Sequence, residues 1–484
     1  MPQFSSHEVT AWFRNEVQSG RYFIHLLLAV AGIIVLILPA LNNGFPLMFY
    51  DSGTYIMNGH NEVVPIDRPI LYCLFISVFN SLWMAIIVQA MIVYYIIFRF
   101  VSTLEIKTNP ALVTFVCVAL LSALTSLSHY TSQIIPDILL SLSVLAFLSL
   151  MKSEKIHSAE IFLLLILIGF FNSTHLSNIP VYTASTVAFI LLASLFPKIT
   201  TLQLTRKKIL FAAGALAFSW LTIPSVNYYY NRGFTFSEAK NVIMIANLAE
   251  NGLLNKYLKK TCETQPNSLC EYQDSTMTIG FFLWDGKRSP LYKGGCYDTS
   301  FTDCWRKKND EYGEIISGLF RDKEIRSELM DIAFNNSVRQ MITFWHTQLP
   351  KNSEAQSVNY PIKKYYPEEY PNYKNSTQEY KALYFENQDL LLVLTVILSV
   401  LIILITVING RYKKLPQGIQ SLLVMLAFIL PVNAVLCSAL STISFRYQGR
   451  LIWLVVFAAL LILCIVFPLG SKPAEDGTGN KNSF

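Results

Sequence analysis

The sequence predicts a mainly α, polytopic membrane protein with about ten membrane-spanning helices and one α-rich soluble domain. Of its 484 residues, 53% are hydrophobic and only 14% are charged, which is too apolar for an ordinary soluble enzyme. The apolar residues are grouped into nearly uncharged runs, close to the ~20 residues that a helix needs to cross a bilayer. Lysine and arginine gather at alternate ends of these runs, which is the pattern of a helical membrane protein.

The ten apolar runs define the predicted spans. They lie near residues 22–41, 84–102, 109–128, 134–151, 159–174, 178–196, 208–226, 388–409, 418–440 and 449–468. The segment 68–84 is apolar as well, but a crossing there would invert every later helix and place the basic loops outside. We therefore expect that segment to form a half-buried helix at the external membrane face.

Basic residues set the orientation of the predicted spans. Arg14 and Arg21 precede the first run, and further lysines or arginines follow the second, fourth, sixth and eighth runs, whereas the loops HYTSQIIPD and FNSTHLSN have none. Because basic loops stay in the cytoplasm, both termini are expected there, with residues 42–83 and 227–387 outside. The first run lacks a small-residue cleavage site and indicates an uncleaved anchor. The net charge of +6 reflects this bias, so it predicts no nucleic-acid partner.

These assignments divide the chain into four parts. Residues 1–226 form an N-terminal membrane module with seven spans, and residues 227–387 form a soluble external domain. Residues 388–470 contain the last three spans, and residues 471–484 form a polar cytoplasmic tail that we expect to be disordered.

Four of the eight cysteines fall in the predicted external domain. Cys262, Cys270, Cys296 and Cys304 form an even set on the oxidising side of the membrane, which predicts two disulfides. Zinc is the alternative, but neither pair has the short spacing of common zinc sites. Three pairings are open; we favour Cys262–Cys270 and Cys296–Cys304, because each closes a short loop.

Two carboxylates stand at the external ends of predicted spans. Asp51 follows the first run in MFYDSGTY, and Asp137 opens the fourth in IIPDILL. Acidic residues at the membrane are costly and usually functional. A purely structural role is the alternative for both: a loop or capping residue at Asp51, and a favourable charge at a helix N-terminus at Asp137.

This layout resembles the GT-C class of membrane glycosyltransferases, which use lipid-linked sugars. The resemblance covers most of residues 22–226 and rests on the first-loop aspartate, the IIPDILL motif and the large external domain. It implies that Asp51 is the catalytic base and that Asp137 is the second acidic residue of the class. Near the C-terminus, SFRYQGRLIW resembles the segment that opens a late span in several such families, and it matches Arg446 and Tyr447.

The chemistry of sugar transfer from a polyprenyl phosphate requires a base for the acceptor hydroxyl and cations for the departing phosphate. Asp51 supplies the base. Four candidates for holding the phosphate lie on the predicted external face: Arg68, His175, Arg446 and Arg450. Snorkelling to the membrane surface is the alternative for the last two. Trp284 and Asp285 are adjacent in the external domain, and this pair of residue types can stack on and hydrogen-bond a sugar.

The first loop also bears on the donor. Asp51 is followed by Ser52 and Gly53, so the paired-acid metal motif of many relatives is absent, and Asp67 is too distant in sequence to complete it. We therefore expect no metal and no cofactor, with a lipid monophosphate-linked sugar as co-substrate. The expected location is a bacterial inner membrane, and the expected acceptor is a cell-envelope glycan or lipid such as lipopolysaccharide or O-antigen. An O-antigen polymerase or ligase and a lipid-linked sugar transporter or flippase are the alternatives.

Overall fold

The protein is built from helices in the computed structural model, which describes residues 21–467 except 105, 153, 155, 198–203, 294–300, 347, 353 and 355. Within these residues there is no strand, only two isolated β-bridges. Six helices are long and apolar enough to cross a membrane: α6 (Leu82–Thr103), α11 (Asn178–Leu195), α13 (Arg206–Tyr229), α23 (Glu386–Ile408), α24 (Gln417–Leu440) and α25 (Phe445–Val466). The prediction of a mainly α membrane protein is confirmed.

Four shorter apolar helices accompany these six: α2 (Arg21–Leu36), α7 (Pro110–Leu124), α9 (Leu139–Leu150) and α10 (Ser158–Asn172). Each overlaps one of the other predicted runs, and α2 and α10 begin one residue before theirs. The first run breaks at Ile37, where α3 (Leu38–Asn43) begins with a proline in its first turn. The apolar segment 68–84 forms only the seven-residue helix α5 (Leu71–Ser77), which is about 10 Å long and far short of a span.

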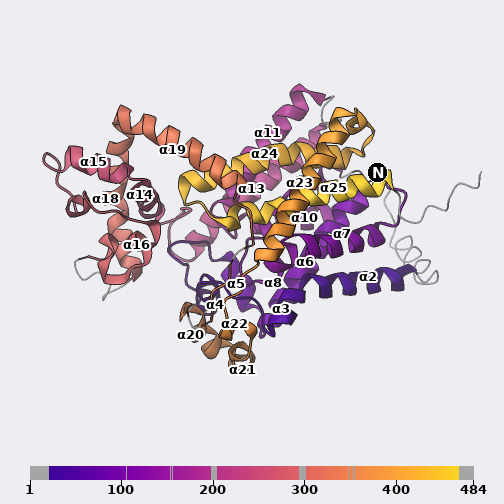
Figure 1. Cartoon of the computed structure of the whole chain (residues 1–484), viewed down its shortest axis with the longest axis horizontal. Coiled ribbons are helices and arrows are strands. Elements are labelled where there is room, and N and C mark those ends of the chain that lie inside the picture. The colour runs from indigo at the N-terminus through magenta and orange to yellow at the C-terminus, as the bar shows by residue number, and fades with distance from the viewer. Residues whose placement is uncertain are drawn as a thin grey trace, which may run out of the picture.

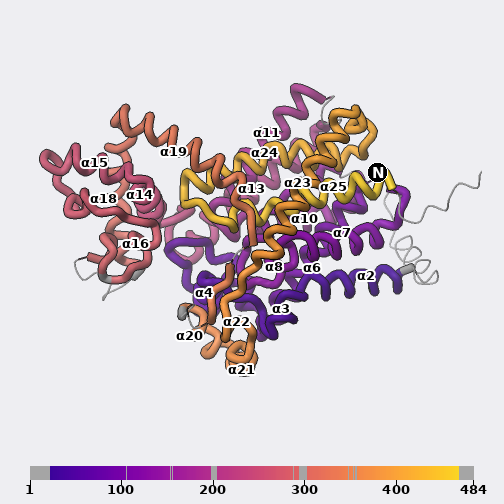
Figure 2. The backbone as a smooth tube through the Cα atoms, in the orientation of Figure 1, coloured from indigo at the N-terminus to yellow at the C-terminus, as the bar shows by residue number. Residues whose placement is uncertain are grey.

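Helix α25 runs through the middle of the membrane bundle, as Figures 1 and 2 show. It packs against α7, α9, α23 and α24. In its most apolar stretch 72% of the residues are buried inside the protein, whereas only 22% are buried in that of α23. The outer helix therefore presents its apolar side chains outward, as a lipid-facing helix does, and α25 serves as the core.

A separate lobe lies at the left of Figure 1. It contains α14 (Lys240–Glu250), α15 (Leu253–Thr261), α16 (Ile279–Trp284), α18 (Phe301–Arg321) and the start of α19 (Lys323–Ile342). These helices enclose their own hydrophobic core around Trp305. The far part of α19 packs along α24 and joins the lobe to the bundle.

The remainder of residues 227–387 belongs with the membrane core rather than with the lobe. Helices α20 (Gln356–Tyr365), α21 (Tyr370–Lys374) and α22 (Thr377–Tyr380) follow the lobe in sequence. Val358, Ile362, Tyr366 and Tyr373 from this segment are buried in the same core as the membrane helices.

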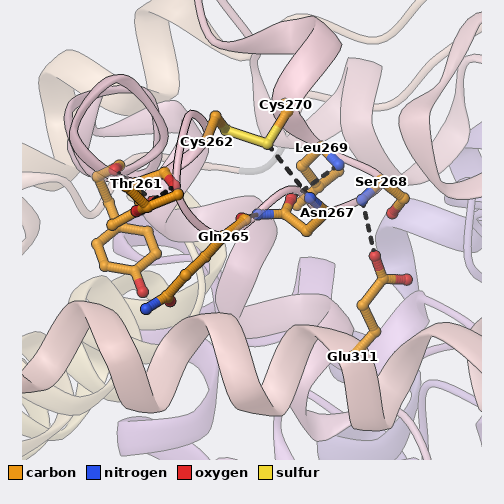
Figure 3. The surroundings of a disulfide bond; sticks show 10 residues. Thr261, Cys262, Gln265, Asn267, Ser268, Leu269, Cys270 and Glu311 are labelled. Atoms are coloured by element: carbon orange, nitrogen blue, oxygen red, sulfur yellow. Dashed lines mark hydrogen bonds between the residues drawn. A yellow bond between two sulfur atoms is a disulfide. The ribbon is translucent and has the colours of Figure 1, made fainter.

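The predicted Cys262–Cys270 disulfide is present and joins the end of α15 to the helix η2 (Cys270–Tyr272), as Figure 3 shows. The loop that it closes is fastened to α18 by Ser268, whose backbone N–H donates to Glu311 at 3.0 Å. Cys304 is also disulfide-bonded. Cys296, the partner predicted for it, lies outside the described residues.

Candidate functional site

Backbone pairing brings Asp51 and Asp137 to the same end of the bundle. The N–H of Leu47 donates to Ser132 O at 2.9 Å, and the N–H of Ile134 donates to Leu47 O at 3.1 Å. The hydroxyl of Ser52 adds a bond to Ile134 O at 3.1 Å. Hydrogen bonds thus join the two loops that carry the carboxylates. Because residues 132–134 pair with Leu47 instead of forming a helix, α9 (Leu139–Leu150) begins later than the predicted run.

A buried glutamine side chain also binds the loop that precedes Asp137. Gln89 lies on α6 and is 2% exposed. Its side-chain amide donates to the carbonyls of Thr131 at 2.9 Å and Gln133 at 3.2 Å, and its oxygen accepts from the hydroxyl of Tyr72 at 3.0 Å. A polar side chain within a spanning helix is costly unless it is bonded, so this residue is a clamp on the loop that leads to Asp137.

Helix α4 (Ser52–Asn61), which follows Asp51, fits between two neighbours through its glycines. A Cβ atom at Gly53 would lie 2.0 Å from the carbonyl oxygen of Ser357 on α20. A Cβ atom at Gly59 would lie 2.1 Å from the carbonyl oxygen of Cys73 on α5. Helix α4 can lie this close to α20 and α5 only because glycine has no side chain. The two contacts hold α4 in place, and Asp51 at its start is held with it.

Asp51 occupies the N-cap position of α4, but its carboxylate makes no capping hydrogen bond. It accepts instead from Arg446 Nη1 at 2.9 Å and from Arg68 Nη2 at 3.2 Å. The side chain of Asp51 therefore does not cap the helix, which was the structural alternative to a catalytic role. The Asp51 side chain is 27% exposed, so it remains reachable from outside.

Asp137 is the buried counterpart of Asp51. Its side chain is fully buried, and its Oδ2 accepts from Arg446 Nε at 2.8 Å. Its Oδ1 lies 4.0 Å from Arg450 Nη1 and has no hydrogen-bond partner among the described residues. Buried in this way, Asp137 is placed to position Arg446 rather than to meet a substrate directly.

Arg446 lies between the two carboxylates, in the first turn of α25. Its guanidinium carbon is 4.6 Å from the centre of the Phe49 ring, a cation–π contact. Its side chain is 12% exposed. A snorkelling arginine would extend to water, whereas Arg446 points into the protein.

Arg68 joins Asp51 to a third carboxylate, Asp67. Its Nη2 is 2.7 Å from Asp67 Oδ2, and its guanidinium carbon lies 5.1 Å from the centre of the Tyr55 ring. The Nη1 atom is buried without a hydrogen-bond partner in the described part of the chain. Sequence spacing gives no sign that Asp67 joins Asp51, because Asp67 lies sixteen positions further along the chain. The signal that could have found it is the DR dipeptide, since an acid beside an arginine in a membrane-flanking loop is a ready ion pair.

Arg450, one turn after Arg446, is fully buried and forms hydrogen bonds with polar side chains. It donates to Asn433 at 2.9 Å, to Ser177 at 3.1 Å and to Asn178 at 3.2 Å. These bonds tie α24 and α11 to α25, so Arg450 is not snorkelling to a membrane surface either. Together, Asp51, Asp67, Asp137, Arg68, Arg446 and Arg450 are termed the acid–arginine cluster below.

His175 and Tyr447 border this cluster. The Nδ1 atom of His175 is 2.8 Å from the hydroxyl of Ser177, and its ring centre is 6.4 Å from that of Tyr447. Burial, reinforced by the charge of Arg450, lowers the pKa of His175 to about 3. His175 is therefore neutral near pH 7 and can offer a phosphate a hydrogen bond but no charge.

Trp284 and Asp285 lie elsewhere, in the lobe. The ring of Trp284 is 5.5 Å from that of Trp305, and Asp285 pairs with Arg288 at 2.7 Å. Helix α16, which ends at Trp284, is separated from α4 and α5 in Figure 1. The structure does not bring these two residues together with Asp51, and a sugar site there stays a prediction.

The electrostatics of the cluster decide what Asp51 can do. Burial raises the pKa of its carboxyl group, but the charges of Arg68 and Arg446 outweigh burial and hold that pKa well below its usual value. Asp51 is therefore ionised, but two guanidinium groups occupy its oxygens. Carboxylates are also the groups here that could hold a cation, yet no three His, Cys, Asp or Glu side chains converge as metal ligands in the residues that the structure covers.

The fold and this cluster define a polytopic helical membrane protein with a charge-dense site at one end of its bundle. Comparisons with protein-family models, curated proteins and solved structures find no match for the chain.

Proposed function

We propose that the protein is a GT-C-type glycosyltransferase that moves a sugar from a polyprenyl-phosphate carrier, such as undecaprenyl phosphate, to a cell-envelope glycan or lipid. The single observation that carries the proposal is the partly exposed carboxylate of Asp51, held between two arginines at the end of an apolar helix bundle. A base and phosphate-binding cations are the two elements that this reaction requires. In this proposal the reaction takes place at the periplasmic face of a bacterial inner membrane, where the distribution of lysine and arginine predicts both loops of the cluster to lie.

In the proposed reaction, the acceptor hydroxyl oxygen bonds to the anomeric carbon of the sugar. The bond from that carbon to the carrier phosphate oxygen breaks, and the phosphate keeps the electron pair. The hydroxyl proton passes to Asp51. Arg446 and Arg68 stabilise the charge that develops on the phosphate, and their planar groups can each donate two hydrogen bonds.

The resting geometry gives this reaction a built-in order. Asp51 is a poor base while Arg68 and Arg446 hold both of its oxygens. A donor phosphate competes for the same guanidinium groups. As it draws them away, Asp51 loses its compensating charges and its basicity rises. The base is therefore activated only when donor is bound.

The test is mass analysis of envelope glycans from cells that carry the wild-type gene, no gene, or the Asp51→Asn gene. The proposal expects one sugar to be missing without the gene and with Asp51→Asn. The matched control is Asp274→Asn, which changes an aspartate that is 77% exposed on the lobe and should restore the sugar. Loss of all long chains would indicate a polymerase or ligase instead, and unchanged glycan masses would overturn the transferase.

A further inference from the structure

A second charged site lies at the opposite end of α25. Cys464 and Ile465, in the last turns of this helix, line a cavity of about 910 Å³. Arg446 lies in its first turn, so about 27 Å of helix separates the cavity from the acid–arginine cluster. This length matches a hydrocarbon core of about 30 Å, and the two sites therefore lie at opposite membrane faces.

Five lysines line the cavity, and Glu154 is the one acidic residue among the lining residues that the structure describes. The lysines are Lys107, Lys152, Lys208, Lys413 and Lys414. They come from four separate segments: the α6–α7 connection, the end of α9, the first turn of α13, and the helix η5 (Arg411–Lys414) before α24. Connections that are far apart in the sequence thus converge to make one basic pocket.

The pocket is a built site rather than a solvated row of charges. Lys208 is only 4% exposed and pairs with Glu154 at 2.9 Å, and the ammonium of Lys152 bonds to Gln417. These contacts fix the wall. Lys413 and Lys414 also line the cavity, and both are exposed. Neither forms an ion pair with any residue that the structure describes, so their ammonium groups can reach a ligand in the cavity.

We infer that this basic pocket binds the phosphate headgroup of an anionic membrane lipid. Several ammonium groups around one cavity suit a phosphate, to which each lysine donates as a point charge. Ile106, Leu415 and Ile465 line the same cavity and give the adjoining acyl chains an apolar wall. Basic pockets between membrane helices recognise lipid headgroups in this way. A free phosphate would use the lysines but not the apolar wall, which favours the lipid.

The test is native mass spectrometry of the full-length protein in detergent, titrated with phosphatidylglycerol or with zwitterionic phosphatidylcholine. We expect phosphatidylglycerol to bind preferentially, and Lys413→Gln/Lys414→Gln to weaken it by at least about 10-fold. The control pair Lys259→Gln/Lys293→Gln removes two lysines that are 58% and 55% exposed on the lobe and should change nothing. Retention time in gel filtration verifies that both double variants are folded.

Two outcomes would overturn the inference. One is equal binding of phosphatidylglycerol by the wild-type protein and by Lys413→Gln/Lys414→Gln. The other is complete displacement of the lipid by inorganic phosphate at a matching concentration, which would assign the pocket to a free phosphate. Failure of either kind leaves the proposed sugar transfer at the other membrane face untouched, because the variants do not alter the acid–arginine cluster.

Discussion

The guanidinium of Arg446 donates to the carboxylate of Asp51 at 2.9 Å, although 395 residues separate them in the sequence. Asp137 anchors the other edge of the same guanidinium at 2.8 Å. One arginine therefore connects the loop after the first apolar run, the start of α9 and the start of α25. The predictions below test what each member of this arrangement contributes.

Replacing Asp51 by asparagine should cut turnover by roughly 10²-fold or more, because an amide cannot take the proton from the hydroxyl group of the acceptor. The fold should survive, since Arg68 keeps Asp67 and Arg446 keeps Asp137. Sugar transfer by the purified variant is the measurement, with Asp274→Asn as the matched control. Near-normal turnover would remove Asp51 from the role of base.

Replacing Asp137 by asparagine should damage the fold more than the same change at Asp51. The carboxylate is fully buried, and its loss removes a negative charge that balances the positive charges of Arg446 and Arg450 in the protein interior. Breaking such a buried pair costs about 3–5 kcal/mol. Thermal unfolding in detergent measures the difference. A stable but inactive Asp137→Asn protein would instead show that Asp137 serves the reaction, directly or through Arg446, more than the fold.

Lysine should replace Arg446 poorly. The arginine uses Nε toward Asp137 and Nη1 toward Asp51, and a single ammonium cannot reproduce both directions. We expect Arg446→Ala to depress turnover strongly and Arg446→Lys to restore only part of it. Both variants should be assayed over a range of donor concentrations. Full activity of Arg446→Gln would show that the charge is dispensable.

The pH dependence follows from the lowered pKa of Asp51. A carboxylate with a depressed folded-state pKa contributes stability above its unfolded value near 3.8, and that stability is lost as pH falls through the lower folded value. In the free enzyme Asp51 therefore stays ionised through weakly acidic pH, and kcat/KM should show no acidic limb from it above pH 3.8. When bound phosphate draws the arginines away, the limb in kcat should move to higher pH. Coincident limbs in the two profiles would contradict donor-induced activation.

Alanine at Gly53 should destabilise the protein by about 1–3 kcal/mol, the usual cost of overpacking. Its Cβ would meet the Ser357 carbonyl at 2.0 Å and push α20 away from α4. Gly214→Ala, within α13, is the matched control, because the new Cβ atom would touch only Leu165 Cδ2, at 3.8 Å. Thermal unfolding of the two variants decides between them. Equal stability would show that α4 is not fixed by this contact.

The helices and the main charged residues could be predicted from the sequence because both leave local signals. Apolar runs predict helices, and charges that interrupt them near their ends are rare enough to single out Asp51, Asp137 and Arg446. Where each helix starts depends on contacts made far away: α9 begins late because residues 132–134 pair with Leu47. That pairing has no signature in either segment alone.

The remaining differences have a similar origin. The sequence distance between Asp67 and Asp51 argues against a pair, but the loop folds so that Arg68 lies between them. Residue type alone points to Trp284 and Asp285 and gives no position in space, and they lie in the lobe. Gln89 has no signal in the sequence, because a glutamine within an apolar run does not reveal which carbonyl groups it will meet.

The pairing of Asp137 with α25 also dictates an order of biosynthesis. Arg446 follows Asp137 by 309 positions, a length of chain that takes about 15–60 s to synthesise at the usual rate of ribosomes. During that interval the newly made N-terminal module carries a carboxylate whose hydrogen-bonding partner in the finished protein does not yet exist. Burying the ionised carboxylate alone would be costly, so we expect Asp137 to stay hydrated or protonated until α25 is inserted. Insertion of α25 is then the step that closes the bundle, and a chain truncated before residue 445 should be recognised as unfinished by membrane proteases.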